Sequence, residues 1–307
     1  KILVIRGGAI GDFLLTLPVC MALRRQFPNT HLEVLGYAHI AQLALIGDLA
    51  DAVRSIEARP LAGFFAKAGT LDPKWQEYFA GFALIISYLF DPDGIFRENI
   101  ARCSKAQFIA GPHRPLDQAG VHASEVFLKP LEQLAIFDAD PEPCLRFGGN
   151  EPGGNVASTS RPMLLAMHPG SGSERKNWPE NKWAELLESM GQTTDLKVLM
   201  VGGEAEGDRL ERLAAKAPSD RCELARSLPL VELAQRLCQC AVFVGHDSGI
   251  THLAAALGLP VLALWGDTAE QVWRPRGRHA TILRDPNGLD ALPVQVVRDH
   301  IALRLKK

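Results

Sequence analysis

The first half of the chain alternates short apolar runs with amphipathic segments. The runs are rich in Ile, Leu, Val and Phe, which is typical of buried β-strands, and the segments between them follow the helical period of about 3.6 residues. This alternation predicts βαβ units and a mainly parallel sheet. The strands are expected over 2–5, 31–36, 83–89 and 106–111. The helices are expected over 12–26 and near 38–46, 94–103 and 122–136.

The same alternation begins again in the second half, which therefore predicts another α/β unit with a parallel sheet. The strands are expected over 163–167, 196–202, 241–245, 260–266 and 280–284. The helices are expected near 180–190, 206–216, 229–239 and 249–257. A last helix is expected in the tail because Val294, Val297, Ile301 and Leu305 fall on one helical face.

Between the two halves lies GGNEPGGNVASTSRP, residues 148–162, which has no apolar period and the composition of a linker. It divides the chain into an N-terminal domain over 1–150 and a C-terminal domain over 151–290, followed by a segment over 291–307. Two Rossmann-like α/β domains joined by one linker predict parallel sheets that face a central cleft. Ligands bind at the carboxyl ends of such strands.

Composition and charge narrow the classes of protein. A chain of 307 residues is about twice a typical domain. The net charge of −2 gives no global positive field for nucleic acid. The six cysteines lack metal-ligand spacing, so we expect buried free thiols in a reducing cytosol and no metal. The longest apolar runs are shorter than the about 20 residues of a membrane helix, so membrane contact is expected to be peripheral.

The strongest chemical signal is the segment AVFVGHDSGITHL, which is a strand, a turn and the start of a helix. Asp247 or Ser248 can cap this helix, and Gly249 permits close approach of a ligand to the backbone. The N–H groups of residues 249–252 then form an anion site that His252 can also reach. The alternative is a plain helix cap with a structural histidine.

A second glycine-rich turn, HPGSGSERKNWP, also follows a predicted strand. Ser171, Gly172 and Ser173 can present N–H and hydroxyl donors to a phosphate. Lys176 or Arg175 can supply positive charge. A solvated surface turn is the alternative, and it suits Arg175 better than Lys176.

A third turn, VGGEAEGDRL, follows the next predicted strand. Glu204 can accept hydrogen bonds from ribose hydroxyls, as acids after strands of such sheets do. Glu206 and Asp208 are expected to place negative charge in the first turn of the following helix. Three turns of this kind at one sheet edge predict a bound nucleoside diphosphate.

The turn RGGAIGD follows the first strand. A dinucleotide-binding GxGxxG would need glycine where Arg6 stands, and Glu33, the nearest candidate for its ribose-binding acid, falls within a strand. A dehydrogenase is therefore disfavoured. Gly8 and Gly11 allow a tight turn that directs Asp12 toward the cleft. Asp12 then begins a helix, as either a plain cap or a general base for an attacking hydroxyl.

These motifs together resemble glycosyltransferase family 9, the ADP-heptose:lipopolysaccharide heptosyltransferases. The resemblance runs from RGGAIGD with the following LTLP, through HPGSGSERKNWP, to DSGITHLAAALGLPVLALWGDT. It implies a GT-B fold and inverting transfer from a nucleotide sugar, ADP-heptose, to a lipid A–core oligosaccharide. It also implies that no metal or other cofactor is required, and that the enzyme works in the cytoplasm at the inner membrane. The segment 291–307 resembles a helix that crosses back to the N-terminal domain.

The resemblance also implies roles for single residues. Asp12 matches the family's catalytic base, and Gly8 and Gly11 belong to its acceptor-side loop. Lys176 matches a diphosphate-binding lysine, and Glu204 stands near a nucleoside-binding glutamate. The donor-binding set implied by the motifs is Ser171, Gly172, Lys176, Glu204, Asp247, Ser248, Gly249 and His252.

Other functions remain open on the residues alone. A sugar-nucleotide epimerase could use the same two-domain frame without an acceptor, and a nucleotide-sugar-binding protein could lack turnover. A transferase of the same family could use another donor or acceptor. The acceptor side departs most from the family pattern, with FDPDG after the strand at 83–89 and an aromatic-rich stretch over 57–82.

Overall fold

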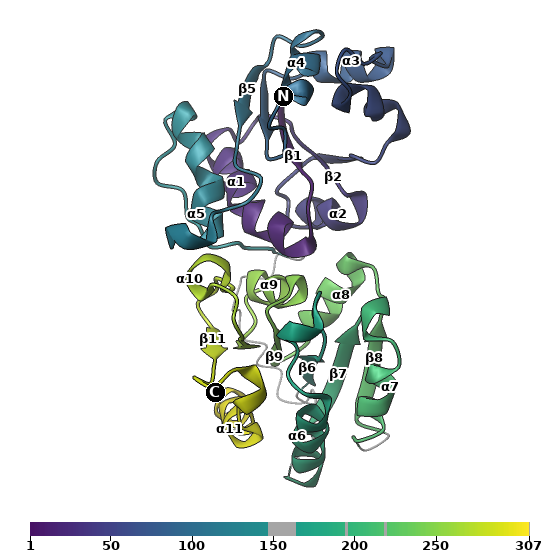
Figure 1. The fold of residues 1–307 in the computed structure, drawn as a ribbon, viewed down its shortest axis with the longest axis vertical. Helices are drawn as coiled ribbons and strands as arrows, with labels where there is room; N and C mark the ends of the chain where they lie inside the picture. The colour runs from purple at the N-terminus through teal and green to yellow at the C-terminus, as the bar shows by residue number, and fades with distance from the viewer. Residues whose placement is uncertain (147–163, 194–195, 218–219, 307) are drawn as a thin grey trace. The chain divides into compact units, whose positions relative to one another are not determined.

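A computed structural model of the protein describes residues 1–146, 164–193, 196–217 and 220–306. The chain forms two compact units, Lys1–Pro143 and Cys144–Lys307, each built around its own parallel sheet (Figure 1). The predicted linker over 148–162 and the boundary after residue 150 lie outside the described residues. The predicted fold class, two α/β units with parallel sheets, is confirmed.

The first unit contains a five-stranded parallel sheet in the order β3-β2-β1-β4-β5. Its strands are β1 Ile2–Arg6, β2 Leu32–Gly36, β3 Ala52–Ser55, β4 Leu84–Ser87 and β5 Gln107–Ala110. Its α-helices are α1 Ile10–Gln26, α2 Ala38–Ile46, α3 Pro73–Ala80, α4 Ile95–Ala101 and α5 Ala123–Leu128. Its 3-10 segments are η1 Arg59–Phe65, η2 Asp117–Ala119 and η3 Lys129–Leu134.

Both faces of the first sheet are covered, because its central strands are apolar on both sides. On one face α1 packs against α2 and α5 (Figure 1). On the other, α3, α4 and η1 supply a cluster of aromatic side chains that packs on Leu3 and Ile5 of β1. Phe79 lies at the centre of this cluster, in ring contact with Phe64 and Phe96.

The second unit contains a six-stranded parallel sheet in the order β11-β10-β9-β6-β7-β8. Its strands are β6 Leu164–His168, β7 Lys197–Gly202, β8 Cys222–Arg226, β9 Val242–His246, β10 Val261–Leu264 and β11 Ala280–Leu283. Its α-helices are α6 Glu180–Thr193, α7 Arg209–Ala214, α8 Leu230–Leu237, α9 Gly249–Ala256, α10 Glu270–Trp273 and α11 Val294–Leu305. Its 3-10 segments are η4 Glu174–Lys176, η5 Glu204–Glu206 and η6 Leu289–Ala291.

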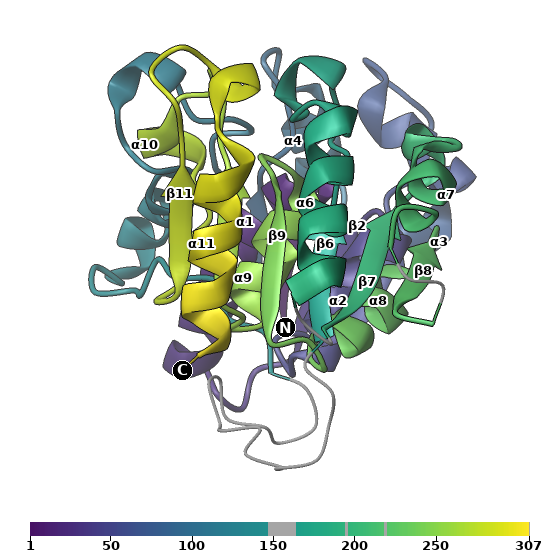
Figure 2. The same cartoon turned by 90° about the horizontal axis from the view of Figure 1, so that it is seen from below.

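Helices cover both faces of the second sheet. α6 and α11 lie side by side on one face, and α8 and α9 lie on the other (Figures 1 and 2). The helix α11, which we expected to cross back to the N-terminal domain, contributes its apolar face to the core of the second unit. Val294, Val297 and Ile301, the face predicted from the sequence, are buried there.

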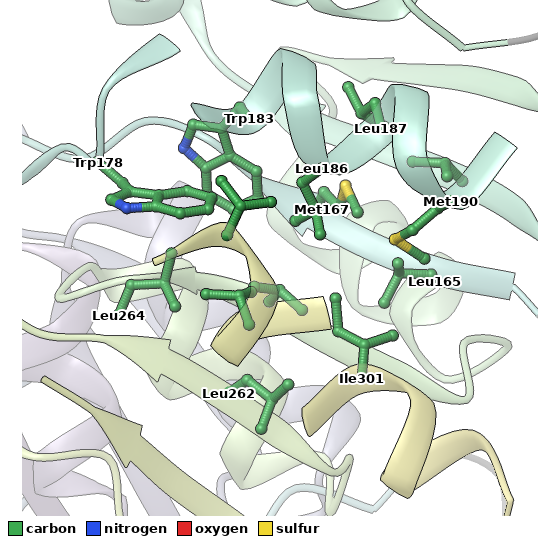
Figure 3. Close-up of a cluster of buried hydrophobic side chains, with 14 of the residues drawn as sticks. Leu165, Met167, Trp178, Trp183, Leu186, Leu187, Met190, Leu262, Leu264 and Ile301 are labelled. Atoms are coloured by element: carbon green, nitrogen blue, oxygen red, sulfur yellow. The ribbon is translucent and has the colours of Figure 1, made fainter. Parts of the chain in front are cut away.

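The core of the second unit is organised around two tryptophans that come just before and at the start of α6. Trp178 and Trp183 are fully buried and meet edge to face, with ring centroids 5.3 Å apart (Figure 3). The Trp178 indole donates a hydrogen bond to the Leu292 carbonyl, 3.1 Å away. Trp178 therefore ties the turn after β6 to the segment that leads into α11.

The predicted pattern of strands and helices is confirmed in both units, but β3, β8, α3 and α10 were not predicted. β3 and β8 lie at the edges of their sheets. Their residues are mostly partly or fully exposed, so neither strand has a continuous apolar run. In β8, Ala225 is the one buried residue, and Glu223, Leu224 and Arg226 are exposed. Such strands form because a neighbouring strand offers hydrogen bonds, which the local sequence does not reveal.

The cysteines are free thiols, as predicted, but burial was overestimated. Cys20 is buried and the other five are partly exposed. Burial raises the pKa of Cys20 to about 12, so this thiol stays protonated. Across the part of the chain that the structure describes, no helix combines the length and apolar character needed to cross a membrane.

The buried tryptophans give a first testable prediction. Trp183→Ala should destabilise the protein by about 3–5 kcal/mol, because it removes a large, fully buried ring from a close-packed core. Chemical unfolding followed by circular dichroism should show a lower transition midpoint. Phe137→Ala, at a side chain that is 76% exposed, is the control and should change the midpoint little. Equal midpoints for Trp183→Ala and wild type would contradict the prediction.

Candidate functional site

The three turns predicted to bind phosphate follow three neighbouring strands of the second sheet. β6 pairs in parallel with β9 on one side, with His168 opposite Gly245, and with β7 on the other. Because the carboxyl ends of parallel strands meet at one edge, the turns after His168, Gly202 and His246 lie at the same edge. The sequence prediction that these turns come together is confirmed within this unit.

The N-terminus of α9 is capped by Ser248. Its hydroxyl oxygen accepts a hydrogen bond from the Thr251 N–H at 3.3 Å, so Ser248 rather than Asp247 is the cap. Gly249 and Ile250 are the first residues of the helix, whose N–H groups have no acceptor inside a helix. Together with the helix dipole, these groups favour an anion at this end. His252 is buried within the first turns.

Asp247 instead forms an ion pair with Lys176. The Lys176 ammonium lies 2.5 Å from a carboxylate oxygen of Asp247, with the lysine side chain 40% exposed and the aspartate side chain 10% exposed. The two residues that the sequence singled out in separate motifs are therefore in direct contact. The cation stands beside the N-terminus of α9, because Asp247 directly precedes the Ser248 cap.

The turn after β6 is held partly by its own side chains. The Ser171 hydroxyl donates to the Ser173 carbonyl at 2.7 Å and accepts from the Ser173 N–H at 3.2 Å. Gly172 is exposed, and a Cβ atom there would meet open space. Arg175 is exposed, which agrees with the solvated alternative for that residue. The exposed backbone of this turn leaves room for a ligand.

His246, which the sequence did not single out, joins both ends of this turn. Its Nε2 accepts a hydrogen bond from the Trp178 N–H at 2.8 Å, and its Nδ1 lies 3.2 Å from the Gly170 carbonyl. A backbone N–H only donates and a carbonyl only accepts, so Nδ1 carries the proton and the ring is neutral. The ring is fully buried against the edge of Trp183.

A second histidine, His168, and the acid Glu206 form a buried polar cluster beneath the turns. The His168 Nδ1 lies 3.2 Å from the Ser248 hydroxyl, and its Nε2 lies 3.9 Å from the Glu206 carboxylate. Glu206 also accepts from the Gly203 N–H at 2.5 Å. A Cβ atom on Gly170 would overlap the Glu206 carboxylate, so only glycine fits there.

The third turn therefore differs from the prediction. Glu206, expected to charge the first turn of a solvated helix, is buried because its carboxylate accepts from the backbone and faces His168. Glu204, expected to bind ribose, is exposed, and its role stays a prediction. A GxxE spacing, in which the acid reaches back to the N–H of the turn, could have identified Glu206 in the sequence.

Burial sets the charge of both histidines. It lowers the pKa of His246 to about 3 and that of His168 to about 4, with the Glu206 carboxylate opposing the shift at His168. Both rings are neutral at pH 7. The buried imidazoles therefore add no positive charge at this edge of the sheet, whereas Lys176 and the N-terminus of α9 do.

A pocket of about 300 Å³ lies at the same edge of the sheet, beside the turns that follow β10 and β11. It is lined by Trp265, Gly266 and Asp267 after β10 and by Arg284, Asp285, Pro286 and Gly288 after β11. Because Leu264 of β10 pairs with His246 of β9, the pocket begins one strand away from Asp247. Its lining combines a cation, two carboxylates and an indole.

In the first unit, Arg6 ends β1 as a buried cation. Its Nη1 donates to the His113 carbonyl at 2.8 Å, and its guanidinium lies over the Phe127 ring, 4.5 Å from the centroid. Its Nη2 is 3.5 Å from an Asp12 carboxylate oxygen. Burial lowers the pKa of Arg6, and the Asp12 carboxylate counteracts that shift, so the aspartate serves as the counterion of the buried guanidinium.

Asp12 is the third residue of α1, which begins two positions earlier than predicted. Its carboxylate accepts from the Ala9 N–H at 3.0 Å, so the helix-cap role is present, and its side chain is 29% exposed. Gly8 has φ of 98° and a Cβ there would lie 2.8 Å from the carboxylate, which explains this glycine. Gly11, by contrast, was wrongly predicted to bend the chain, because it lies inside α1 without a positive φ.

The architecture of both units is shared with a solved enzyme. Escherichia coli ADP-heptose lps heptosyltransferase II matches with a TM-score of 0.79 at 18% identity, over 100% of this chain and 99% of that one. Two Rossmann-like units with parallel sheets, matched by this enzyme over the whole chain, define a GT-B type of fold.

The family follows from the sequence. A family model, Glycosyltransferase family 9 (heptosyltransferase), matches residues 139–294, and the chain belongs to this family. Lipopolysaccharide heptosyltransferase 1 of Pseudomonas aeruginosa is 37% identical over 112 residues, or 36% of this chain and 31% of that protein. The chain thus matches about a third of the length of such relatives. Lipopolysaccharide heptosyltransferase 3 of Escherichia coli is 25% identical over 86% of this chain and 82% of its own.

The neutral histidines predict a pH dependence of stability. Their folded pKa values lie near 4 and 3, below the unfolded value of about 6.5, so the unfolded chain binds more protons between these limits. Stability should therefore fall as the pH drops from 6.5 toward 4. Melting temperatures between pH 7.5 and 4.5 measure this fall, and it should be shallower in His168→Asn, which has one titrating group fewer. Identical slopes in the two proteins would contradict the assignment.

Proposed function

We propose that this protein is an inverting glycosyltransferase that moves heptose from ADP-heptose to a lipopolysaccharide inner-core acceptor. The observation that carries the proposal is the Lys176–Asp247 ion pair beside the capped N-terminus of α9. A partly exposed cation next to a helix N-terminus provides two features that bind a diphosphate. Membership of family 9 supports the reaction type, and the name of the solved relative supports ADP-heptose as the donor.

In this reaction the second unit binds the donor. Lys176 and the N–H groups of Gly249 and Ile250 stabilise the negative charge that develops on the departing ADP, and the His252 side chain adds a hydrogen bond. Of the predicted N–H groups of residues 249–252, those of Thr251 and His252 already donate to Ser248. Ser171, Gly172 and the Ser248 turn contribute further donors, and Glu204 accepts from the ribose. Stabilisation of the leaving group by donors that are already in place is the largest contribution in reactions of this kind.

Asp12 is the general base of the proposed reaction. It takes the proton of the acceptor hydroxyl while that oxygen bonds to the anomeric carbon and the bond to the diphosphate breaks. Each carboxylate oxygen has two lone pairs, so the bond from the Ala9 N–H leaves capacity for the acceptor proton. Arg6 holds the carboxylate from the other side.

The remaining substrate and location assignments also belong to the proposal. The acceptor is a lipid A–core oligosaccharide, reached on the cytoplasmic face of the inner membrane by a peripherally bound enzyme. The donor sugar nucleotide is a substrate, and the reaction needs no metal or other cofactor because Lys176 and backbone N–H groups neutralise the leaving group. Membership of family 9 and the names of its lipopolysaccharide heptosyltransferases support a lipopolysaccharide acceptor.

Product analysis tests the proposed reaction. Purified protein is incubated with ADP-heptose and defined heptose-deficient core acceptors, and the products are read by mass spectrometry. The expected result is an acceptor heavier by one heptose residue. Isomerised donor in the absence of acceptor would indicate an epimerase instead. Donor binding without turnover on any acceptor would indicate a binding protein.

Asp12→Asn tests the base. The amide oxygen can still accept from the Ala9 N–H, so the helix cap is kept while the proton acceptor is lost. We expect kcat to fall by about 10²–10⁴-fold, with ADP affinity unchanged. Asp72→Asn is the matched control, because Asp72 is a carboxylate that caps α3 and takes no part in the proposed reaction. Transfer by Asp12→Asn within a few-fold of wild type would rule Asp12 out as the base.

Lys176→Ala tests the phosphate contact. Loss of the ammonium should weaken ADP binding by roughly tenfold or more, because a charge-assisted hydrogen bond contributes about 1.5–3 kcal/mol. The KM for the acceptor should change much less. Titration calorimetry with ADP and steady-state kinetics with varied acceptor separate the two effects. Equal losses for donor and acceptor would place Lys176 outside the diphosphate site.

A further inference from the structure

The turn that carries Lys176 is held at both ends by one side chain. The segment runs from Gly170 to Trp178. The His246 imidazole donates a hydrogen bond to the Gly170 carbonyl and accepts one from the Trp178 N–H. The next residue along the chain, Asp247, binds Lys176 itself. Two consecutive residues of β9 and its turn thus fix the ends of the segment and the cation within it.

We propose that His246 is a positioning residue for donor binding: its neutral ring fixes both ends of the 170–178 turn and thereby sets where Lys176 stands relative to the N-terminus of α9. The inference rests on the proposed function, in which Lys176 binds the diphosphate. It adds a residue that touches neither substrate nor reacting atoms.

The imidazole suits this role because its two nitrogens point in different directions and have opposite hydrogen-bonding roles. The proton on Nδ1 goes to the Gly170 carbonyl, and Nε2 receives the Trp178 N–H. Loss of the ring would leave two buried backbone groups without partners, which is costly in a dry core. The Trp178 anchor is itself immobile, because its ring is packed against Trp183 (Figure 3).

Anchoring matters because the turn between its ends is exposed. Ser173, Glu174 and Arg175 all face solvent, and Ser171 bonds within the turn. A free segment of this kind would lose conformational entropy when Lys176 is fixed by a ligand. With its ends already fixed, less entropy is lost on binding and affinity is higher.

A double-mutant cycle with ADP titrations measures the coupling. Lys176→Met removes the cation and keeps the chain length. His246→Leu removes both anchors, His246→Gln keeps an acceptor for the Trp178 N–H, and His246→Asn keeps a donor for the Gly170 carbonyl. We expect His246→Leu to weaken ADP binding by roughly tenfold, with smaller losses for Gln and Asn. In the Lys176→Met background, His246→Leu should change affinity by less than about twofold, because residues that act through one another are non-additive.

Val244→Ala is the control for simple destabilisation. It lies two residues earlier on the same strand and in the same core, and it should lower the melting temperature without changing ADP affinity. If His246→Leu does not fold, the same cycle is run with His246→Gln. Unchanged ADP affinity in the folded His246 variants, or losses that add fully to that of Lys176→Met, would overturn the inference. Lys176→Met with wild-type ADP affinity would instead overturn the assignment of Lys176 to the diphosphate site, and the positioning role with it; the product analysis tests the reaction separately.

Discussion

The chemistry of the second unit depends on the parallel pairing of β6 with β9. This pairing places Gly245 opposite His168. It therefore brings together the two turns that follow these strands, which are far apart in the sequence. Lys176 and Asp247 are separated by 71 positions along the chain, yet they are in contact because each follows one of these strands. The helix α9 begins at the same place, so its N-terminus and the cation share one edge of the sheet.

The two units use the same type of edge for opposite charge arrangements. In the first, a buried cation, Arg6, ends the strand and a more exposed acid, Asp12, stands above it. In the second, a largely buried acid, Asp247, follows the strand and a more exposed cation, Lys176, stands above it. In each pair the inner charge needs the outer one, since an isolated buried charge is unstable. The outer group is then oriented at the surface, where it can meet a ligand.

The sequence predicted the features that have a local cause. Apolar runs predicted the central strands, and glycine-rich turns predicted which edge of the second sheet carries the site. The Asp-Ser-Gly turn predicted the cap of α9. It did not predict His246, because a histidine at the end of a strand has no pattern of its own and its partners, the Gly170 carbonyl and the Trp178 N–H, are backbone atoms. The burial of Glu206 depends on the close approach of Gly170, a contact between distant segments.

In the proposed function, the Lys176–Asp247 pair also limits how strongly a diphosphate can bind. The Lys176 ammonium has a carboxylate partner at 2.5 Å, so a phosphate that binds this ammonium replaces one anion by another. The gain in binding free energy is the difference between the Lys176–phosphate and the Lys176–Asp247 interactions. From this is subtracted the cost of pairing Asp247 with another group or with water. Because His246 stays neutral, its ring adds no positive charge beneath the turn. In the proposed function, affinity therefore depends on where Lys176 stands relative to the N-terminus of α9 as well as on its charge, which is why the fixed ends of the turn matter.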